Sequence, residues 1–196
     1  TGPTCWHEPA LRLRRARRRD RLRLSGRGVR YNPCPSPPPA EPAVDVARPH
    51  RSITILIGKT LAHYRITAAL GAGGMGEVYR ARDTRLDRQV AVKLMRAPVA
   101  ADPAQRERFE REARAVSSLG HPNVCTLFDV GEHEGFPFLV MELLEGETLA
   151  GRLACGPLDA AEALRVARDL ASALAAAHRR GIVHRDVKPA NLVLTE

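Results

Sequence analysis

The sequence predicts an α+β protein in which a small antiparallel β-sheet is followed by the beginning of a helical domain. Three observations predict this class. Residues 53–196 contain, in order, strand-like segments, one helical segment, further strand-like segments and a long helical segment. A cluster of glycines joins the first two strand-like segments, and a change in charge and proline content separates residues 1–52 from the rest.

The net charge belongs to the amino-terminal part of the chain. The 196 residues carry a formal net charge of +9, but residues 1–51 hold 12 basic and 4 acidic residues and 9 of the 15 prolines. Residues 1–52 therefore predict a disordered tail, because such a segment buries too little apolar surface to offset the entropy lost on ordering. The alternative is a basic arm for nucleic acid or anionic lipid, but its two aromatic residues give poor support for base stacking and disfavour nucleic acid as a partner.

Three strands are expected ahead of the first helix, at residues 64–70, 77–82 and 89–95. The polar residues 83–88 form the turn between the second and third strands. Asp102 and Pro103 then predict a helix start, because aspartate is a favoured N-cap and proline fits the first helical position. This helix is expected to end near residue 119, before Gly120.

The remaining elements alternate in the same way. Two strands, 124–130 and 136–141, are expected around a turn at Gly135. Asp159 and Glu162 have the spacing of a capping box and predict the start of a long helix. One face of that helix is apolar, and it carries Val166, Leu170, Ala173, Leu174 and Ala177 ahead of the terminating Gly181.

Composition also bears on compartment. No run of 18 apolar residues is present, so no transmembrane helix is expected, and no secretory signal is visible. The four cysteines have no CxxC spacing, which disfavours a zinc site. We expect a cytoplasmic location, and attachment to a membrane through sequence beyond this chain stays open.

The glycine cluster is the first motif that carries chemistry. Gly71, Ala72, Gly73, Gly74, Met75 and Gly76 precede Glu77 and Val78 and satisfy the pattern G-x-G-x-x-G-x-V. Glycines let backbone amides approach phosphate oxygens without obstruction. A dinucleotide-binding loop should open a helix and precede an acidic residue, whereas a strand and then Lys93 follow here. A glycine-rich hairpin turn without a ligand is the other alternative.

Lys93 ends the strand sequence Val-Ala-Val-Lys. A lysine facing a phosphate cradle can neutralise the α- and β-phosphates of a nucleotide, and the alternative is an exposed strand lysine. An anionic partner on the following helix could hold it in place. Glu107, Glu110 and Glu112 compete for that role, and Glu112 is favoured because it shares a helical face with Val116.

The last motif leads to a family. His184-Arg185-Asp186-Val187-Lys188-Pro189-Ala190-Asn191 satisfies H-R-D-x-x-x-x-N. With the glycine loop, the strand lysine and the helix glutamate in this order, the sequence resembles eukaryotic-type (Hanks-type) protein kinases, particularly bacterial serine/threonine kinases. The resemblance implies the protein kinase-like fold, with an antiparallel N-lobe sheet, helix C and hinge at 53–144 and a truncated helical C-lobe at 145–196.

The resemblance implies ATP and Mg²⁺ as cofactors. The glycine loop would cover the ATP phosphates, and Lys93 would contact the α- and β-phosphates while paired with Glu112. Val78 and Ala91 resemble the apolar roof over adenine, and Val193 resembles the floor of the same site.

The expected hinge lies at residues 142–144. Met141 resembles the gatekeeper at the back of the adenine pocket. The Glu142 carbonyl and the Leu144 amide would contact the edge of the adenine. Met141 and Leu144 can equally serve as ordinary core residues, and the two roles are compatible.

The resemblance also assigns the catalytic loop. Asp186 would be the catalytic base that orients the substrate hydroxyl, and Lys188 would contact the γ-phosphate. Asn191 would hold a magnesium ion. Arg185 resembles the arginine that pairs with a phosphorylated activation loop, and His184 is expected to pack in the lobe rather than act in acid–base chemistry.

No Asp-Phe-Gly tripeptide, which supplies the main magnesium ligand in the family, occurs in the sequence. We therefore expect the parent protein to be an ATP-dependent serine/threonine kinase, and this chain alone to be inactive or nearly so. The apolar face along residues 166–177 is expected to lack its packing partners.

Two other function classes remain as alternatives. A pseudokinase or ATP-binding scaffold is disfavoured because Lys93, Asp186 and Asn191 are present. A small-molecule kinase of similar fold is disfavoured by the complete glycine loop and by Lys188 followed by Pro189. The expected partners are protein substrates bearing Ser or Thr. Self-association or autophosphorylation is also compatible with a protein kinase.

Overall fold

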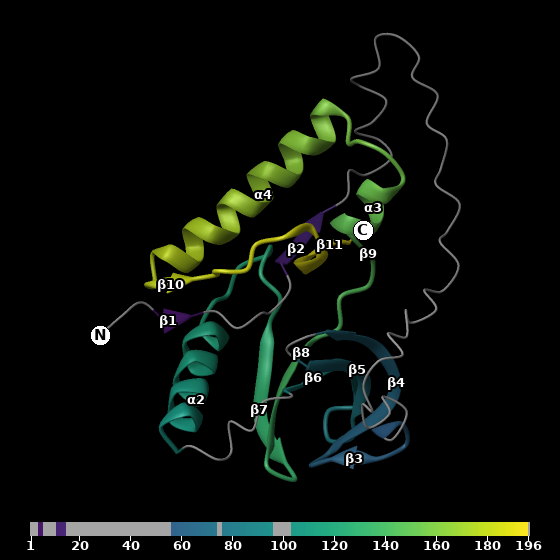
Figure 1. The fold of residues 1–196 in the computed structure, drawn as a ribbon, viewed down its shortest axis with the longest axis vertical. Helices are drawn as coiled ribbons and strands as arrows, with labels where there is room; N and C mark the ends of the chain where they lie inside the picture. Colours follow the sequence, from purple (N-terminus) through teal and green to yellow (C-terminus); the bar gives the residue numbers. More distant parts are fainter. Residues whose placement is uncertain (1–3, 6–10, 15–55, 74–75, 96–102, 196) are drawn as a thin grey trace, which may run out of the picture.

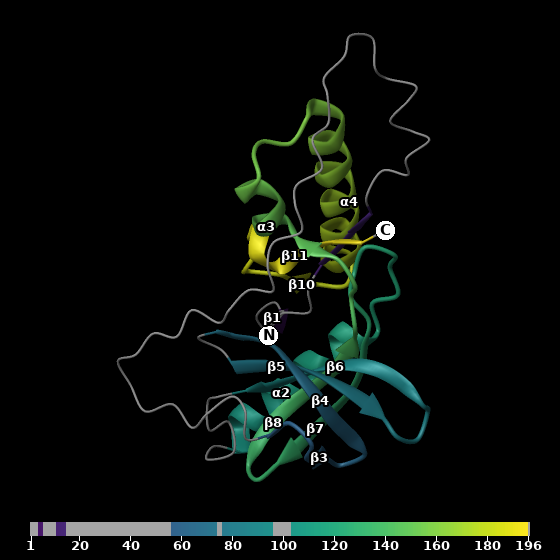
Figure 2. The ribbon, with the colours of Figure 1, turned by 90° about the vertical axis from the view of Figure 1, so that its right-hand side faces the viewer.

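The computed structural model describes residues 4–5, 11–14, 56–73, 76–95 and 103–195. These residues form a sheet with one helix, α2, and a second part that contains helices α3 and α4 (Figure 1). Seen from the side, the sheet lies at one end of the molecule, and α3, α4 and β11 lie at the other (Figure 2). This arrangement confirms the predicted α+β class, with an antiparallel N-lobe sheet and the start of a helical lobe.

The N-lobe sheet has six antiparallel strands in the order β3-β4-β5-β6-β8-β7. Their bounds are β3 Thr60–Leu61, β4 Tyr64–Gly73, β5 Gly76–Asp83, β6 Arg88–Met95, β7 Leu127–His133 and β8 Phe136–Glu142. The expected strands are confirmed, but β7 begins three residues later than the expected 124. Val124 instead forms an isolated antiparallel bridge with Leu11, so residues 124–126 serve as a linker.

The two faces of this sheet have different neighbours. Because side chains alternate along a strand, one face buries a cluster that includes Tyr79, Val92 and Phe138. The opposite face packs against α2 (Pro103–Ser117), which buries Phe109 and Val116 in the main core. The expected N-cap of this helix, Asp102, lies outside the described residues.

Among the described residues, the chain after β8 adds three short strands, two α-helices and one 3-10 helix. The strands are β9 (Glu147–Thr148), β10 (Ile182–Val183) and β11 (Leu192–Thr195), and the helices are α3 (Leu149–Ala154) and α4 (Ala160–His178). Asp159 accepts a hydrogen bond from the Glu162 amide at 2.7 Å, which confirms the expected cap of α4. Sequence reasoning missed α3, whose six residues are capped by Thr148. No helix of the described chain is long and apolar enough to cross a membrane.

The amino-terminal segment contributes two strands to this second part. β1 (Thr4–Cys5) pairs in parallel with β10, and β2 (Leu11–Arg14) pairs in parallel with β11. The expectation that residues 1–52 form a tail outside the domain is therefore wrong for Leu11–Arg14. The physical reason is that Leu11 and Leu13 are both fully buried. These four residues bury apolar surface although residues 1–52 as a whole are basic and rich in proline. The rest of 1–52, apart from β1, lies outside the described residues.

The apolar face of α4 has packing partners. Ala173 and Ala177 are fully buried in the same cluster as Leu11 and Leu13. The expectation that this face lacks partners is therefore wrong for its carboxy-terminal part, because β2 packs against α4, whereas Val166 and Leu170 are only partly buried against the same core. Leu164, earlier on the helix, is 71% exposed and marks the part of α4 that this core does not cover.

Candidate active site

The glycine cluster lies on the hairpin formed by β4 and β5. In the strand register, Gly71 lies opposite Val78, Ala72 opposite Glu77, and Gly73 opposite Gly76, whereas Gly74 and Met75 lie outside the described residues. Gly76 has φ +153°, and a Cβ added there would stand 2.1 Å from the Leu94 carbonyl oxygen, so only glycine fits. At Gly71 nothing lies within 4 Å of an added Cβ, so the space beside this backbone position is open.

One face of the sheet gathers the predicted nucleotide-binding side chains. Lys93 lies opposite Val78 on one side and Leu139 on the other, and Ala91 lies opposite Met141. Directly opposed residues of an antiparallel pair share a face, as do residues two positions apart. Val78, Ala91, Lys93 and Met141 therefore line the same face, and the nucleotide roles assigned to them stay predictions.

The lysine and the predicted helix glutamate are both withdrawn from solvent. Lys93 and Glu112 are each 6% exposed, which contradicts the alternative of an exposed strand lysine. Glu112 accepts a hydrogen bond from Arg108 Nε at 3.0 Å. Glu107 is exposed, and the Glu110 side chain is 42% exposed beside Arg114. Burial thus singles out Glu112 among the three glutamates, and its pairing with Lys93 stays a prediction.

The predicted hinge is bonded to the linker that precedes β7. The Glu142 amide donates to the Thr126 carbonyl at 2.9 Å, and the Cys125 thiol contacts the Glu142 carbonyl oxygen at 3.5 Å. Burial, together with the nearby Glu142 carboxylate, raises the pKa of the Cys125 thiol to about 12. Leu144 packs partly against the main core, and Val193 lies half-buried on β11.

The predicted catalytic loop brings Lys188 and Asn191 into direct contact with Asp186. Lys188 Nζ lies 2.6 Å from Asp186 Oδ2. Asn191 Nδ2 donates to the Asp186 carbonyl at 2.9 Å and to Asp186 Oδ2 at 3.0 Å. The turn that makes this possible is a 3-10 helix, Pro189–Asn191, in which the Asn191 amide bonds the Lys188 carbonyl at 2.9 Å. The carboxylate therefore lies between a cation and an amide donor.

The two residues before Asp186 shape the loop. Arg185 has φ +58°, a conformation that a non-glycine residue rarely adopts and that turns the chain sharply. His184 is 1% exposed, and its carbonyl and its Nδ1 both accept from the Asp186 amide, at 2.8 and 3.3 Å. The burial of His184 agrees with a packing role, and its contacts position the Asp186 backbone.

The oxygens of this loop suit a magnesium ion only in part. The carboxylate of Asp186 and the side-chain carbonyl of Asn191 are the hard oxygen ligands that Mg²⁺ prefers. Among the described residues, no group of three or more His, Cys, Asp or Glu side chains could hold a metal. A magnesium ion held here would therefore complete its coordination with phosphate oxygens and water.

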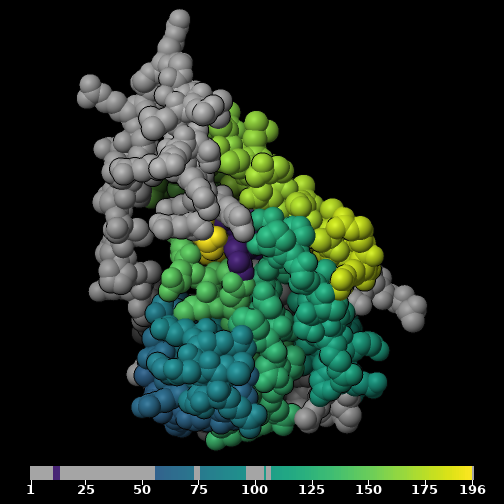
Figure 3. Space-filling view, turned by 180° about the vertical axis from the view of Figure 1, so that it is seen from behind, coloured from purple at the N-terminus to yellow at the C-terminus, as the bar shows by residue number. Residues whose placement is uncertain are grey.

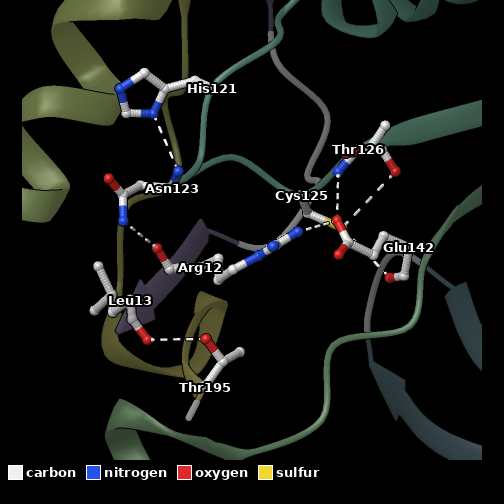
Figure 4. A network of polar contacts seen from close by, with 8 residues as sticks. All are labelled: Arg12, Leu13, His121, Asn123, Cys125, Thr126, Glu142 and Thr195. Carbon is white, nitrogen blue, oxygen red and sulfur yellow. Dashed lines mark hydrogen bonds and ion pairs between the residues drawn. The ribbon is translucent and has the colours of Figure 1, made fainter. Parts of the chain in front are cut away.

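Sequence reasoning missed the residues that tie the amino-terminal segment to this region. Arg12 pairs with the Glu142 carboxylate, and Asn123 donates to the Arg12 carbonyl at 3.1 Å (Figure 4). The one available signal was the alternation of leucine and arginine at residues 11–14, which is typical of a half-buried strand.

Comparison with known proteins decides the family. Residues 64–196 match the protein kinase domain. The chain belongs to the protein kinase domain family. Its curated relatives include the serine/threonine-protein kinase PrkC of Bacillus subtilis, 45% identical over 142 residues, and PknB of Mycobacterium leprae, 43% identical over 137 residues. This likeness confirms the predicted resemblance of the chain to bacterial Hanks-type serine/threonine protein kinases.

The kinase-family chain spans only part of these relatives. The PrkC match covers 71% of this chain and 22% of PrkC, and the PknB match covers 67% of this chain and 22% of PknB. Among solved structures, the kinase domain of Mycobacterium tuberculosis PknI is 36% identical with a TM-score of 0.64. That match covers 71% of this chain and 58% of the PknI chain.

Proposed function

We propose that this chain is part of the catalytic domain of an ATP-dependent protein serine/threonine kinase. The observation that carries the proposal is the convergence of Asp186, Lys188 and Asn191 within hydrogen-bond distance. Bacterial relatives named serine/threonine-protein kinases support the choice of hydroxyl acceptor. Protein side chains of Ser and Thr are accordingly the proposed substrates.

The nucleotide would lie between the glycine hairpin and β11. Val78 and Ala91 present an apolar surface on one face of the sheet, on which Lys93 provides a buried positive charge. A buried ammonium interacts more strongly with phosphate than an exposed one, because water screens it less. Lys93 would therefore hold the α- and β-phosphates, with Glu112 limiting its motion.

The catalytic loop would act on the acceptor hydroxyl. ATP supplies the γ-phosphoryl group, which the hydroxyl oxygen attacks as the bond to ADP breaks. The Asp186 carboxylate orients this hydroxyl and accepts its proton. Asn191 holds the Asp186 carboxylate in place through Nδ2, and the Lys188 ammonium places a positive charge where the transferred group gains negative charge.

The same residues suit a magnesium ion bound with the nucleotide. Asn191 would present its side-chain carbonyl oxygen to the metal while its Nδ2 stays on Asp186. A magnesium ion would offset the charge of the phosphates. Since the sequence contains no Asp-Phe-Gly, we propose that the chain alone binds nucleotide but transfers phosphate slowly or not at all.

The competing proposal is a pseudokinase that binds ATP without transferring phosphate. Lys93, Asp186 and Asn191 disfavour it, because these are the positions whose loss most simply abolishes transfer. The codons that follow Glu196 discriminate between the two. An Asp-Phe-Gly encoded within a few residues supports the enzyme, and a reading frame that continues without it supports the pseudokinase.

A binding measurement tests the nucleotide site directly. We expect a fluorescent ATP analogue to bind the chain in a magnesium-dependent manner and to be displaced by ATP. A phosphotransfer assay with a generic basic protein substrate is expected to show little turnover. Absence of nucleotide binding by the folded chain would overturn the proposed site, and strong magnesium-dependent turnover would overturn the proposed inactivity.

A further inference from the structure

Strand β2 lies between β11 and the linker to β7. Residues Leu11–Arg14 run parallel to β11, with Leu11 opposite Leu192 and Leu13 opposite Leu194. In the space-filling view, β2 lies in contact with the carboxy-terminal residues on one side and the α2–β7 region on the other (Figure 3). Four residues that composition assigns to a tail thus complete the sheet beside the candidate active site.

The backbone of β2 is bonded on both edges. The Arg12 amide donates to the Asn123 carbonyl at 3.1 Å, and Asn123 Nδ2 donates back to the Arg12 carbonyl at 3.1 Å. On the other edge, Thr195 Oγ1 donates to the Leu13 carbonyl at 3.4 Å, in addition to the strand pairing with β11. Pairing of an extended backbone with the edge of an existing sheet, as β2 pairs with β11, is the geometry by which a sheet edge binds a peptide strand.

The side chains of β2 fix its register. Leu11 and Leu13 are fully buried with Ala173 and Ala177 of α4, whereas Arg12 points the other way. A shift by one residue would place Arg12 in the apolar cluster and expose the leucines, at a large cost in free energy. The site therefore accepts an extended segment in which apolar residues flank a basic one.

Arg12 connects this strand to the hinge. Its guanidinium pairs with the Glu142 carboxylate, which also accepts from the Thr126 amide at 3.4 Å (Figure 4). The two paired side chains are only 24% and 28% exposed, so solvent screens the pair less than one on the surface. Arg12 and Glu142 line a cavity of about 570 Å³ together with Leu143, Leu144 and Thr195.

We propose that the edge of β11 is a strand-acceptor site that this chain fills with its own residues 11–14, and that Arg12 thereby ties the amino-terminal segment to the hinge. The evidence for the acceptor site consists of the contacts of β2 alone and does not depend on nucleotide binding. Only the identification of residues 142–144 as a hinge that contacts nucleotide rests on the proposed function. Filling the site is expected to order β11 and residues 123–126, which contact β2.

Hydrogen exchange on the full chain tests the site without using nucleotide. The double variant Leu11→Asp/Leu13→Asp is expected to raise amide exchange in residues 192–195 and 123–126 at least tenfold, and to leave β4–β6 unchanged. Arg65→Ala, an exposed arginine on β4, is the matched control for Arg12→Ala. We expect Arg12→Ala to raise exchange at 123–126 and 142–144 severalfold. Unchanged exchange at 192–195 in the double variant would overturn the proposal.

A peptide added in trans keeps the proposal testable if the double variant is poorly folded. A labelled peptide of residues 10–15 is expected to bind the double variant and to restore protection at 192–195. The same peptide with its leucines and arginines exchanged in position should bind at least tenfold more weakly. Equal binding of the two peptides, or no binding to a variant whose N-lobe is folded, would overturn the acceptor site. Failure of the wild-type chain to bind the ATP analogue, with protection at residues 192–195 retained, would instead contradict the proposed function alone.

Discussion

The Asn191 side chain bonds both the backbone and the side chain of Asp186. One amide group, Asn191 Nδ2, donates to the Asp186 carbonyl at 2.9 Å and to the Asp186 carboxylate at 3.0 Å. The carboxylate is shared with Lys188, so the predicted base, the predicted metal ligand and the predicted phosphate contact form one hydrogen-bonded unit. Substitution of one member should therefore affect the others.

Replacing Asn191 tests this unit. Asn191→Ala removes a donor to the Asp186 carboxylate and an oxygen suited to magnesium, so we expect the magnesium-dependent affinity for an ATP analogue to fall about tenfold, or about 1.4 kcal/mol. The affinity measured without magnesium should change little. Titration of the analogue at several magnesium concentrations measures both. An equal loss with and without magnesium would contradict a metal-binding role.

Replacing Lys93 tests the phosphate contact. Lys93→Met keeps much of the side-chain volume but removes a charge from a position that is 6% exposed. A hydrogen bond to a charged group contributes about 1.5–3 kcal/mol, so the affinity for an ATP analogue should fall roughly 10–100-fold. Lys59→Met, at an exposed lysine ahead of β3, is the matched control. Adenosine, which has no phosphates, should bind the Lys93 variant almost as well as the wild type, and equal losses for both ligands would refute the assigned contact.

The sequence predicted the local features of this molecule better than the distant pairings. The contact between Asp186 and Asn191 is local, because the two residues are only five positions apart and meet within one turn, and their catalytic roles stay predictions. The pairing of β2 could not be predicted, because the alternation at residues 11–14 does not indicate which strand is its partner, and Leu13 and Thr195 are 182 residues apart. Likewise Arg12 and Glu142 are separated by 130 residues, and no local pattern indicates such a pair.

Gly76 tests how tightly the hairpin is built. Gly76→Ala places a Cβ 2.1 Å from the Leu94 carbonyl oxygen at φ +153°, so the backbone of β5 or β6 must move. We expect a loss of about 2–4 kcal/mol in the free energy of unfolding, measured by urea denaturation. Gly71→Ala, where nothing lies within 4 Å of the added Cβ, should cost less than about 1 kcal/mol. Similar losses for both variants would contradict the close approach at Gly76.

The lowered pKa of Asp83, at the β5–β6 turn, predicts that the free energy of unfolding decreases at acid pH. Burial alone would raise the pKa of Asp83, but hydrogen bonds from the Leu86 and Arg85 amides and from Arg88, with His63 nearby, outweigh it and hold that pKa below its usual value. A carboxyl group whose pKa is lowered by folding contributes stability above its unfolded pKa of about 3.9, and the contribution is lost as the pH falls through the lower folded value.

We therefore expect Asp83→Asn to unfold at a lower urea concentration than the wild type at pH 7. The difference should persist down to about pH 4 and then shrink as the wild-type carboxylate takes up its proton. Asp87→Asn is the control, because Asp87 lies on the same turn and its side chain is 74% exposed. In the described part of the chain it pairs with the half-exposed Arg82, and such a surface pair contributes little to stability. A difference between wild type and Asp83→Asn that stays constant from pH 7 to pH 2.5 would show that the turn is stabilised by shape and not by the charge of Asp83.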